Sequence, residues 1–129
     1  MALIHADAIY TINPGKLDEF KALVAESMRI VREQDTRTLR YDFFFNADET
    51  VCTAREIYDG FEGLVESMTH NAEVFPKLFA ITTYRFLIYG EPTPELRAFA
   101  SQYGCELHTH FMSREGERDD VTGAVTELG

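Results

Sequence analysis

The sequence predicts an α+β fold in the order strand, helix, strand, strand, helix, strand, with an antiparallel sheet that carries its helices on one face. Three observations support this order. Several segments alternate apolar and polar residues with a period of two, which is typical of strands. Other segments repeat apolar residues at helical spacing. A short polar turn joins two of the strands, which makes their pairing antiparallel.

The first half of the chain contains a strand, a helix and a hairpin. Residues 3–12 alternate cleanly, and a turn sequence with Pro14 and Gly15 follows. We expect Asn13 to cap a helix whose first turn contains Pro14 and which runs to about Glu33. Two further strands, over residues 38–45 and 50–58, form the hairpin.

The second half repeats the pattern and adds a further helix. Apolar residues at helical spacing predict a helix that ends near His70, and a short helix over residues 73–79 follows. Residues 81–89 form the fourth strand. A helix over residues 94–103 begins after Thr93, and residues 106–112 are a possible fifth strand. This order is the ferredoxin-like, split βαβ arrangement.

The domain organisation follows from a change in composition near the C-terminus. We expect one domain over residues 1–112, which includes the helix 94–103 and the possible strand 106–112. Residues 113–129 are charged at first and have little periodicity, so we expect a mobile tail.

Composition excludes several classes of partner. The chain has 129 residues with 12 basic and 22 acidic side chains, which gives a formal charge of −10. Such a charge repels phosphate, so we expect no binding to nucleic acid or to anionic membranes. No apolar run approaches the length of a membrane span, and no signal peptide is recognisable. Cys52 and Cys105 are expected to be reduced core residues of a cytoplasmic protein.

The predicted sheet leaves one face without helices. In one strand register this face shows Tyr41, Phe43 and Phe45, and in the other it shows Phe44. Because an apolar face of this kind is unfavourable in water, we predict a twofold homodimer that forms largely through the sheets.

Three short motifs fall at the ends of predicted strands and in the hairpin: Asn13-Pro14-Gly15-Lys16, Tyr41-Asp42-Phe43-Phe44-Phe45 and Arg55-Glu56-Ile57-Tyr58-Asp59. In the third motif, an acidic residue is followed two positions later by a tyrosine. Over residues 3–90, and into the segment 90–96, the chain resembles the antibiotic biosynthesis monooxygenase (ABM) superfamily of dimeric α+β barrels. The third motif is similar to the Glu-x-(Trp/Tyr) pair of that superfamily.

The resemblance implies a monooxygenase that oxidises a small aromatic or quinol-type substrate with molecular oxygen and needs no flavin, metal or haem. Such chemistry requires an apolar pocket, a base, and donors for the developing negative charge. The expected catalytic residues are Glu56 and His70. The expected substrate-binding residues are Tyr41, Tyr58, Tyr84, Arg55 and Asn71. The partner molecules expected are a small hydrophobic or aromatic ligand and a second copy of the chain.

Each of these residues has an alternative, structural interpretation. His70 also fits a histidine that faces solvent at the end of a helix, and alignment from Glu56 brings Ser67 nearer to the histidine of the superfamily. Glu56 and Tyr58 also fit a structural carboxylate and a core aromatic residue. His108 and His110 have the spacing of two ligands on one strand face, but they equally fit an exposed strand, and we expect no metal site.

An alternative function remains open beside the monooxygenase. The same fold could form a non-catalytic dimeric module that binds a hydrophobic metabolite, because fold alone does not determine activity. The sequence contains no glycine-rich phosphate loop, no serine-hydrolase motif and no zinc-protease motif. It also contains no tryptophan, which makes haem degradation, known in a related branch, a poor fit.

Overall fold

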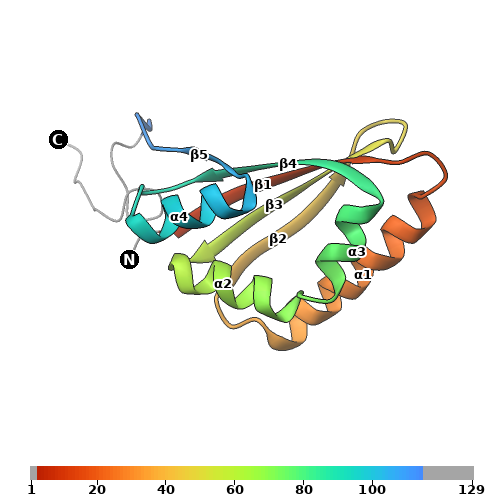
Figure 1. The fold of residues 1–129 in the computed structure, drawn as a ribbon, viewed down its shortest axis with the longest axis horizontal. Helices are drawn as coiled ribbons and strands as arrows, with labels where there is room; N and C mark the ends of the chain where they lie inside the picture. The colour runs from red at the N-terminus through yellow and green to blue at the C-terminus, as the bar shows by residue number, and fades with distance from the viewer. Residues whose placement is uncertain (1–2, 115–129) are drawn as a thin grey trace.

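A computed structural model of the chain describes residues 3–114 and shows one five-stranded sheet with four helices (Figure 1). The strands are β1 (Leu3–Ile12), β2 (Thr38–Phe45), β3 (Val51–Asp59), β4 (Thr82–Tyr89) and β5 (Glu106–His108). Their spatial order is β2-β3-β1-β4-β5. The first four strands pair antiparallel, and β5 is parallel to β4. The predicted ferredoxin-like α+β fold is therefore confirmed, with a mixed rather than a purely antiparallel sheet.

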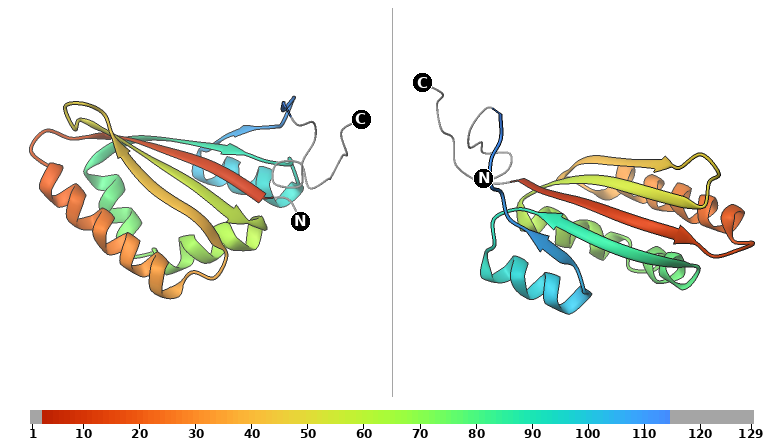
Figure 2. Two further views of the ribbon diagram at one scale, coloured as in Figure 1. Left: turned by 180° about the vertical axis from the view of Figure 1, so that it is seen from behind. Right: turned by 90° about the horizontal axis from the view of Figure 1, so that it is seen from above.

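The helices are α1 (Leu17–Gln34), α2 (Gly60–His70), α3 (Val74–Ala80) and α4 (Pro94–Tyr103). Helices α1 to α3 cover one face of the sheet, and α4 lies at one end of the same side (Figure 2). Helix α4 begins as its sequence predicts, because the Thr93 hydroxyl accepts a hydrogen bond from the Leu96 amide at 3.2 Å. None of the helices in the described part of the chain has both the length and the hydropathy of a membrane span.

The start of α1 differs from the prediction. Asn13 does not cap the helix, which begins only at Leu17. Instead the Lys16 amide donates to the Asn13 carbonyl at 3.1 Å, and Gly15 adopts a φ of 80°. A residue with this positive φ cannot be part of a right-handed helix, so the segment forms a turn before the helix starts.

The core lies between the sheet and the helices. Alternate residues of β1, including Ile4, Ala8 and Tyr10, are buried on this inner face. Helix α2 approaches the sheet closely at Gly63, where an added Cβ would lie 3.0 Å from the Cβ of Arg37. An added Cβ would also lie 3.3 Å from the Cβ of Tyr58 on β3, so a side chain at this position would force its neighbours to shift.

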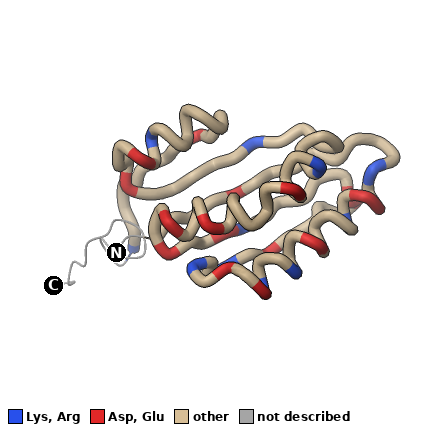
Figure 3. Tube along the Cα trace, turned by 60° about the horizontal axis from the view of Figure 1, so that its bottom comes forward, with Lys and Arg blue, Asp and Glu red and all other residues tan. Residues whose placement is uncertain are grey.

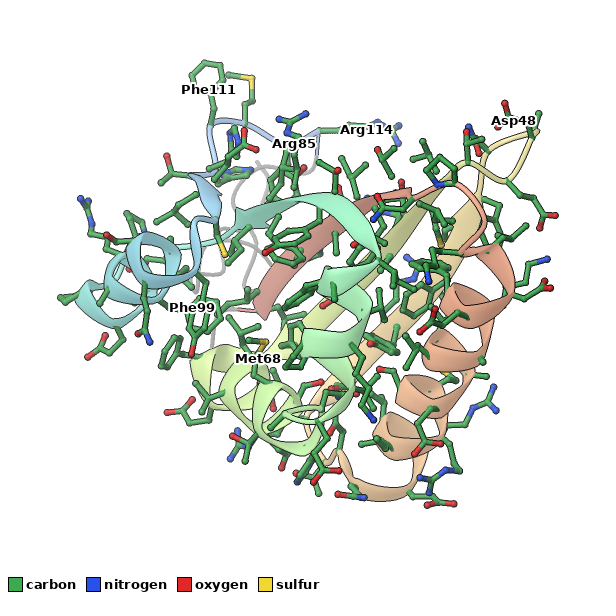
Figure 4. All side chains as sticks on the ribbon, turned by 45° about the vertical axis from the view of Figure 1, so that its right-hand side comes forward. Asp48, Met68, Arg85, Phe99, Phe111 and Arg114 are labelled. Carbon is green, nitrogen blue, oxygen red and sulfur yellow. The ribbon has the colours of Figure 1, made fainter. Side chains whose placement is uncertain are left out.

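The opposite, outer face of the sheet carries both apolar and charged side chains. Ile9, Ile57 and Leu87 are partly buried there, whereas Phe44 is 54% exposed. Arg85, which projects from this face in Figure 4, donates hydrogen bonds to Glu106 at 2.9 and 3.0 Å. The aromatic residues Tyr41, Phe43 and Phe45 belong to the inner face, so Phe44 is the aromatic residue that β2 presents outward.

The C-terminal strand is shorter than expected. Strand β5 covers Glu106–His108, three residues instead of the possible seven up to Met112. Its pairing with β4 also involves only three residues, from Leu87 to Tyr89. Most of the expected tail, residues 115–129, lies outside the described part of the chain.

Acidic residues are spread along the helical side of the molecule, where several lie on α1 and α2 (Figure 3). Asp18 and Glu19 lie in the first turn of α1, and Glu62 lies in the first turn of α2. These positions favour helix formation because they face the positive ends of the helix dipoles.

Candidate functional site

A cavity of about 400 Å³ lies between the inner face of the sheet and helices α2, α3 and α4. Its volume is in the range of sites that bind small molecules. Ala6 and Ala8 lie on the part of β1 that lines the cavity, and their small side chains leave space in front of the neighbouring strands. The carboxyl of Glu56, on β3, lines the same cavity beside Ala6, its partner in the strand register.

Glu56 is the carboxyl of this cavity whose pKa is raised by its environment. Burial raises the pKa of its carboxyl to about 7, and the nearby negative charge of Asp7 adds a smaller increase. The Tyr58 hydroxyl donates a hydrogen bond to the Glu56 carboxylate, which opposes this increase. A carboxyl with this pKa is partly protonated and partly ionised near neutral pH. A group that exchanges protons with a ligand needs both forms to be populated.

Tyr58 is almost completely buried, with 2% of its surface exposed. Burial raises its pKa well above the ordinary value for tyrosine, and the neighbouring Glu56 charge adds to this effect. Tyr58 therefore remains a neutral hydrogen-bond donor at physiological pH. The period of two along β3 places Tyr58 and Glu56 on the same face, so their contact is a direct consequence of strand geometry.

Aromatic rings form one wall of the cavity. The ring centroids of Phe79 and Tyr84 are 4.7 Å apart, and those of Tyr84 and Phe86 are 4.9 Å apart. Phe99 and Tyr103 of α4 line the opposite side. Such a lining favours a flat apolar ligand, because aromatic rings attract each other in offset and edge-to-face arrangements.

A buried hydrogen-bond network lies behind this cavity. The hydroxyl groups of Ser27 and Tyr41 are 2.7 Å apart, and Ser27 also donates to the Asn71 side chain at 2.7 Å. Asn71 is fully buried and donates in turn to the Ser67 carbonyl at 2.9 Å. Because buried polar groups need such partners, the network fixes α1, α2 and β2 relative to one another. Tyr41 and Asn71 thus lie close to the cavity without being among the residues that line it.

His70 and Arg55 lie outside the cavity. The Nδ1 atom of His70 is 2.6 Å from the carboxylate of Asp35, whose side chain is only 1% exposed. Arg55 is next to Glu56 in sequence and therefore points to the outer face, where it donates to Asp7 at 3.2 Å. Of the seven expected site residues, the cavity thus brings together Glu56, Tyr58 and Tyr84.

One group of potential metal ligands lies outside the cavity. Within residues 3–114, one group of three has its ligand atoms within 4.8 Å of one another: Asp35, Glu66 and His70. The Glu66 carboxylate there already accepts hydrogen bonds from the backbone of Thr36 and Arg37. His108 stacks on Tyr89, with ring centroids 5.7 Å apart, and His110 contacts Ser113.

Several residues that line the cavity were not predicted to be functional from the sequence. The pairs Phe75 and Phe79, and Phe99 and Tyr103, are each four positions apart on a helix, so their spacing predicts one apolar face. That signal does not distinguish a packed core from the wall of a cavity.

Comparison with known proteins gives matches to solved structures only. No family model and no curated protein matches the sequence. A crystal structure of MupZ from Pseudomonas fluorescens matches with a TM-score of 0.77 and 22% identity, over 88% of this chain and 93% of that one. A Nitrosomonas europaea protein assigned to the antibiotic biosynthesis monooxygenases matches with a TM-score of 0.60 and 16% identity, over 71% of this chain and 92% of that one. This chain has the ABM fold.

A further ABM-fold structure adds an activity to the comparison. SnoaB from Streptomyces nogalater, a cofactor-independent oxygenase, matches with a TM-score of 0.60 and 12% identity, over 70% of this chain and 94% of that one. The two ABM structures thus match about 70% of the chain, whereas MupZ matches 88%. At these identities the likeness establishes the fold, and the chemistry depends on the residues of this chain.

Proposed function

We propose that the protein is a cofactor-independent monooxygenase of the ABM type, which oxidises a small aromatic or quinol-type substrate with molecular oxygen. The observation that carries this proposal is the position of Glu56, a carboxyl with a pKa of about 7 in a cavity otherwise lined mainly by aromatic and aliphatic side chains. The oxygenase activity of SnoaB, on the same fold, supports it.

In the proposed reaction the substrate supplies the electrons. Glu56 removes a proton from a phenol, or from the acidic carbon of its keto form, and the resulting anion reacts directly with oxygen. For 1-naphthol the balance is one naphthol and one O₂ giving one naphthoquinone and one water. The naphthol loses its hydroxyl hydrogen and one ring hydrogen, one oxygen atom of O₂ becomes the second carbonyl oxygen, and the other leaves as water with the two hydrogens.

The neighbours of Glu56 have different roles in this proposal. Tyr58 donates a hydrogen bond to the carboxylate and holds it in place. Tyr84 and the rings around it bind the flat face of the substrate. The Tyr41 and Asn71 network keeps the helices at the distance that leaves the cavity open. We assign His70 a structural role, because it pairs with Asp35 at the junction of α1 and α2.

The outer face of the sheet is the proposed dimer interface. Ile9, Ile57 and Leu87 are partly buried apolar residues of this face and lie around Asp7, which pairs with Arg55; the Arg85–Glu106 ion pair lies beside them. A second copy placed face to face would remove these apolar side chains from water, and twofold symmetry would let charges of opposite sign meet across the interface. The free cysteines Cys52 and Cys105 fit the reducing cytoplasm, where we place the protein.

Oxygen consumption tests the proposed activity. Purified protein freed of metal and flavin is mixed with a panel of naphthols, quinols and anthrones in an oxygen electrode. We expect uptake above the protein-free rate with at least one compound, and a rate 10²- to 10⁴-fold lower for Glu56→Gln, as is usual when a general base is removed. Tight binding of a panel compound without any oxygen uptake would instead identify the non-catalytic module that binds a hydrophobic metabolite.

A further inference from the structure

A groove on the surface of the molecule adjoins the cavity beside Glu56. This groove has a volume of about 780 Å³ and lies between α2, α3 and α4. Six residues line both the groove and the cavity: Met68, Phe75, Phe79, Phe99, Gln102 and Tyr103. Two hollows that share six side chains lie next to each other, so only these side chains separate the cavity beside Glu56 from the groove.

Met68 and Phe99 lie at the boundary between the two hollows. Met68 extends from α2 and Phe99 from α4 into the space between these helices (Figure 4). Both side chains are partly buried. Methionine has three rotatable bonds and adapts its shape to a neighbouring group, so this boundary can admit a flexible chain.

Most of the residues that line the groove are apolar, and Thr69, Glu95 and Gln102 are its polar ones. Val65, Ala72 and Ala98 line it together with the rings of Phe61 and Phe75, and Glu95 is its acidic residue. Val65 is 41% exposed and Tyr103 is 46% exposed, so the groove presents apolar surface to water. A formal charge of −10 on the chain disfavours an anionic occupant such as a fatty acid carboxylate.

We propose that the ligand has two parts: a ring that occupies the cavity beside Glu56, and an uncharged hydrocarbon chain that leaves between Met68 and Phe99 and lies in the groove along α4. This inference rests on the proposed function insofar as both place the reacting ring next to Glu56. It adds that the groove along α4 selects substrates by the length of their hydrocarbon chain. A compact ring alone would leave the groove empty.

Binding of 4-alkylphenols to the full chain, measured by calorimetry without turnover under nitrogen, tests this proposal. Burying one methylene is worth roughly 0.8 kcal/mol, or about fourfold in affinity. In an open groove we expect about half that energy for each methylene, so 4-octylphenol should bind at least about tenfold more tightly than 4-butylphenol.

Two variants of α4 separate the groove from unspecific hydrophobic binding. Ala98→Asp places a charge in the groove at an exposed position, and Ser101→Asp places the same charge on the same helix outside it. We expect Ala98→Asp to abolish the gain with chain length while phenol and butylphenol bind as before. Ser101→Asp should keep the gain.

Three results would overturn the proposal: no gain with chain length in the unmodified protein, the same gain in Ala98→Asp, or an equal loss in both variants. Sedimentation of Ala98→Asp completes the test. A loss of self-association in this variant alone would show that the groove is covered by a second copy rather than by a ligand. Binding is measured without oxygen, so the chain-length effect can be tested even in a protein that consumes no oxygen. Failure of this proposal is therefore distinguishable from failure of the proposed oxygenase activity.

Discussion

Tyr58 donates its hydroxyl hydrogen bond to the carboxylate of Glu56, two positions earlier on the same strand, and both side chains border the same cavity. This contact joins a nearly fully buried donor to a carboxyl whose pKa is raised by burial to about 7. The pair therefore links the packing of β3 to the proton chemistry proposed for the site. It also makes the behaviour of Glu56 measurable in two independent ways, through stability and through activity.

The first prediction concerns stability as a function of pH. Unfolded Glu56 has the ordinary pKa of 4.5, and in the folded protein it rises to about 7. Between these two values the folded state binds more protons than the unfolded state, so the contribution of Glu56 favours folding below pH 4.5 and is lost as pH rises to 7. Its full size is up to about 3 kcal/mol.

Urea unfolding of the unmodified protein and of Glu56→Gln between pH 4.5 and 8 measures this contribution. The variant carries no titrating group at this position, so the difference in unfolding free energy between the two proteins should change across the window. We expect the variant to gain stability relative to the unmodified protein as pH rises. A difference that stays constant with pH would mean that Glu56 titrates as an ordinary exposed carboxyl.

The second prediction concerns the pH dependence of turnover. Because the base must be ionised, kcat/KM should rise with pH through a value near 7. The hydrogen bond from Tyr58 lowers the pKa of Glu56, so Tyr58→Phe should move this rise to higher pH. Tyr84→Phe removes a hydroxyl from the same cavity and should leave the position of the rise unchanged. Equal profiles in all three proteins would remove Glu56 from the proton transfer.

The third prediction concerns His70. Its Nδ1 atom lies 2.6 Å from Asp35, a carboxylate with 1% side-chain exposure at the end of α1. His70→Ala removes this partner and should lower the free energy of unfolding by about 1–3 kcal/mol, while kcat with a naphthol substrate changes less than about twofold. His108→Ala, at an exposed position with a single ring contact to Tyr89, is the control and should lower stability much less than His70→Ala. A large loss of kcat in His70→Ala would show that this histidine takes part in catalysis and contradict its structural assignment.

The fourth prediction concerns the dimer. Ile57 lies on the outer face of β3, opposite His5 on β1 and Arg40 on β2. Ile57→Asp should weaken self-association at least about 100-fold, because an unpaired carboxylate would be buried in the interface. Sedimentation velocity at micromolar concentrations measures this, with Ser101→Asp as a control of equal charge. The account of the outer face fails if the unmodified protein sediments as a monomer.

Many of the correct predictions came from the way successive residues of a strand point to opposite faces of the sheet. A period of two placed Glu56 and Tyr58 on one face of β3, and Arg55 on the other, as the structure confirms. It did not reveal which of the two faces meets the helices. That choice depends on the inner positions of β1, where Ile4, Ala8 and Tyr10 are buried by contacts with distant segments.

The parts of the site that depend on distant contacts were not predictable. His70 and Asp35 are 35 positions apart and meet only because α2 packs beside the end of α1. The cavity itself depends on Ala6 and Ala8 facing large aromatic rings across the core. In sequence, alanines on a strand and aromatic pairs on helices equally indicate a filled core, because periodicity reports which side is apolar and not how tightly it packs.

Substrate ionisation in the absence of oxygen tests the central role of Glu56 most directly. An anthrone or naphthol is mixed with the protein under nitrogen, and the absorption spectrum of the substrate anion is recorded at a pH between 7 and the pKa of the free compound. We predict an anion band with the unmodified protein and no band with Glu56→Gln. Bands of equal intensity with both proteins, or none with either across the substrate panel, would contradict the assignment of Glu56 as the base.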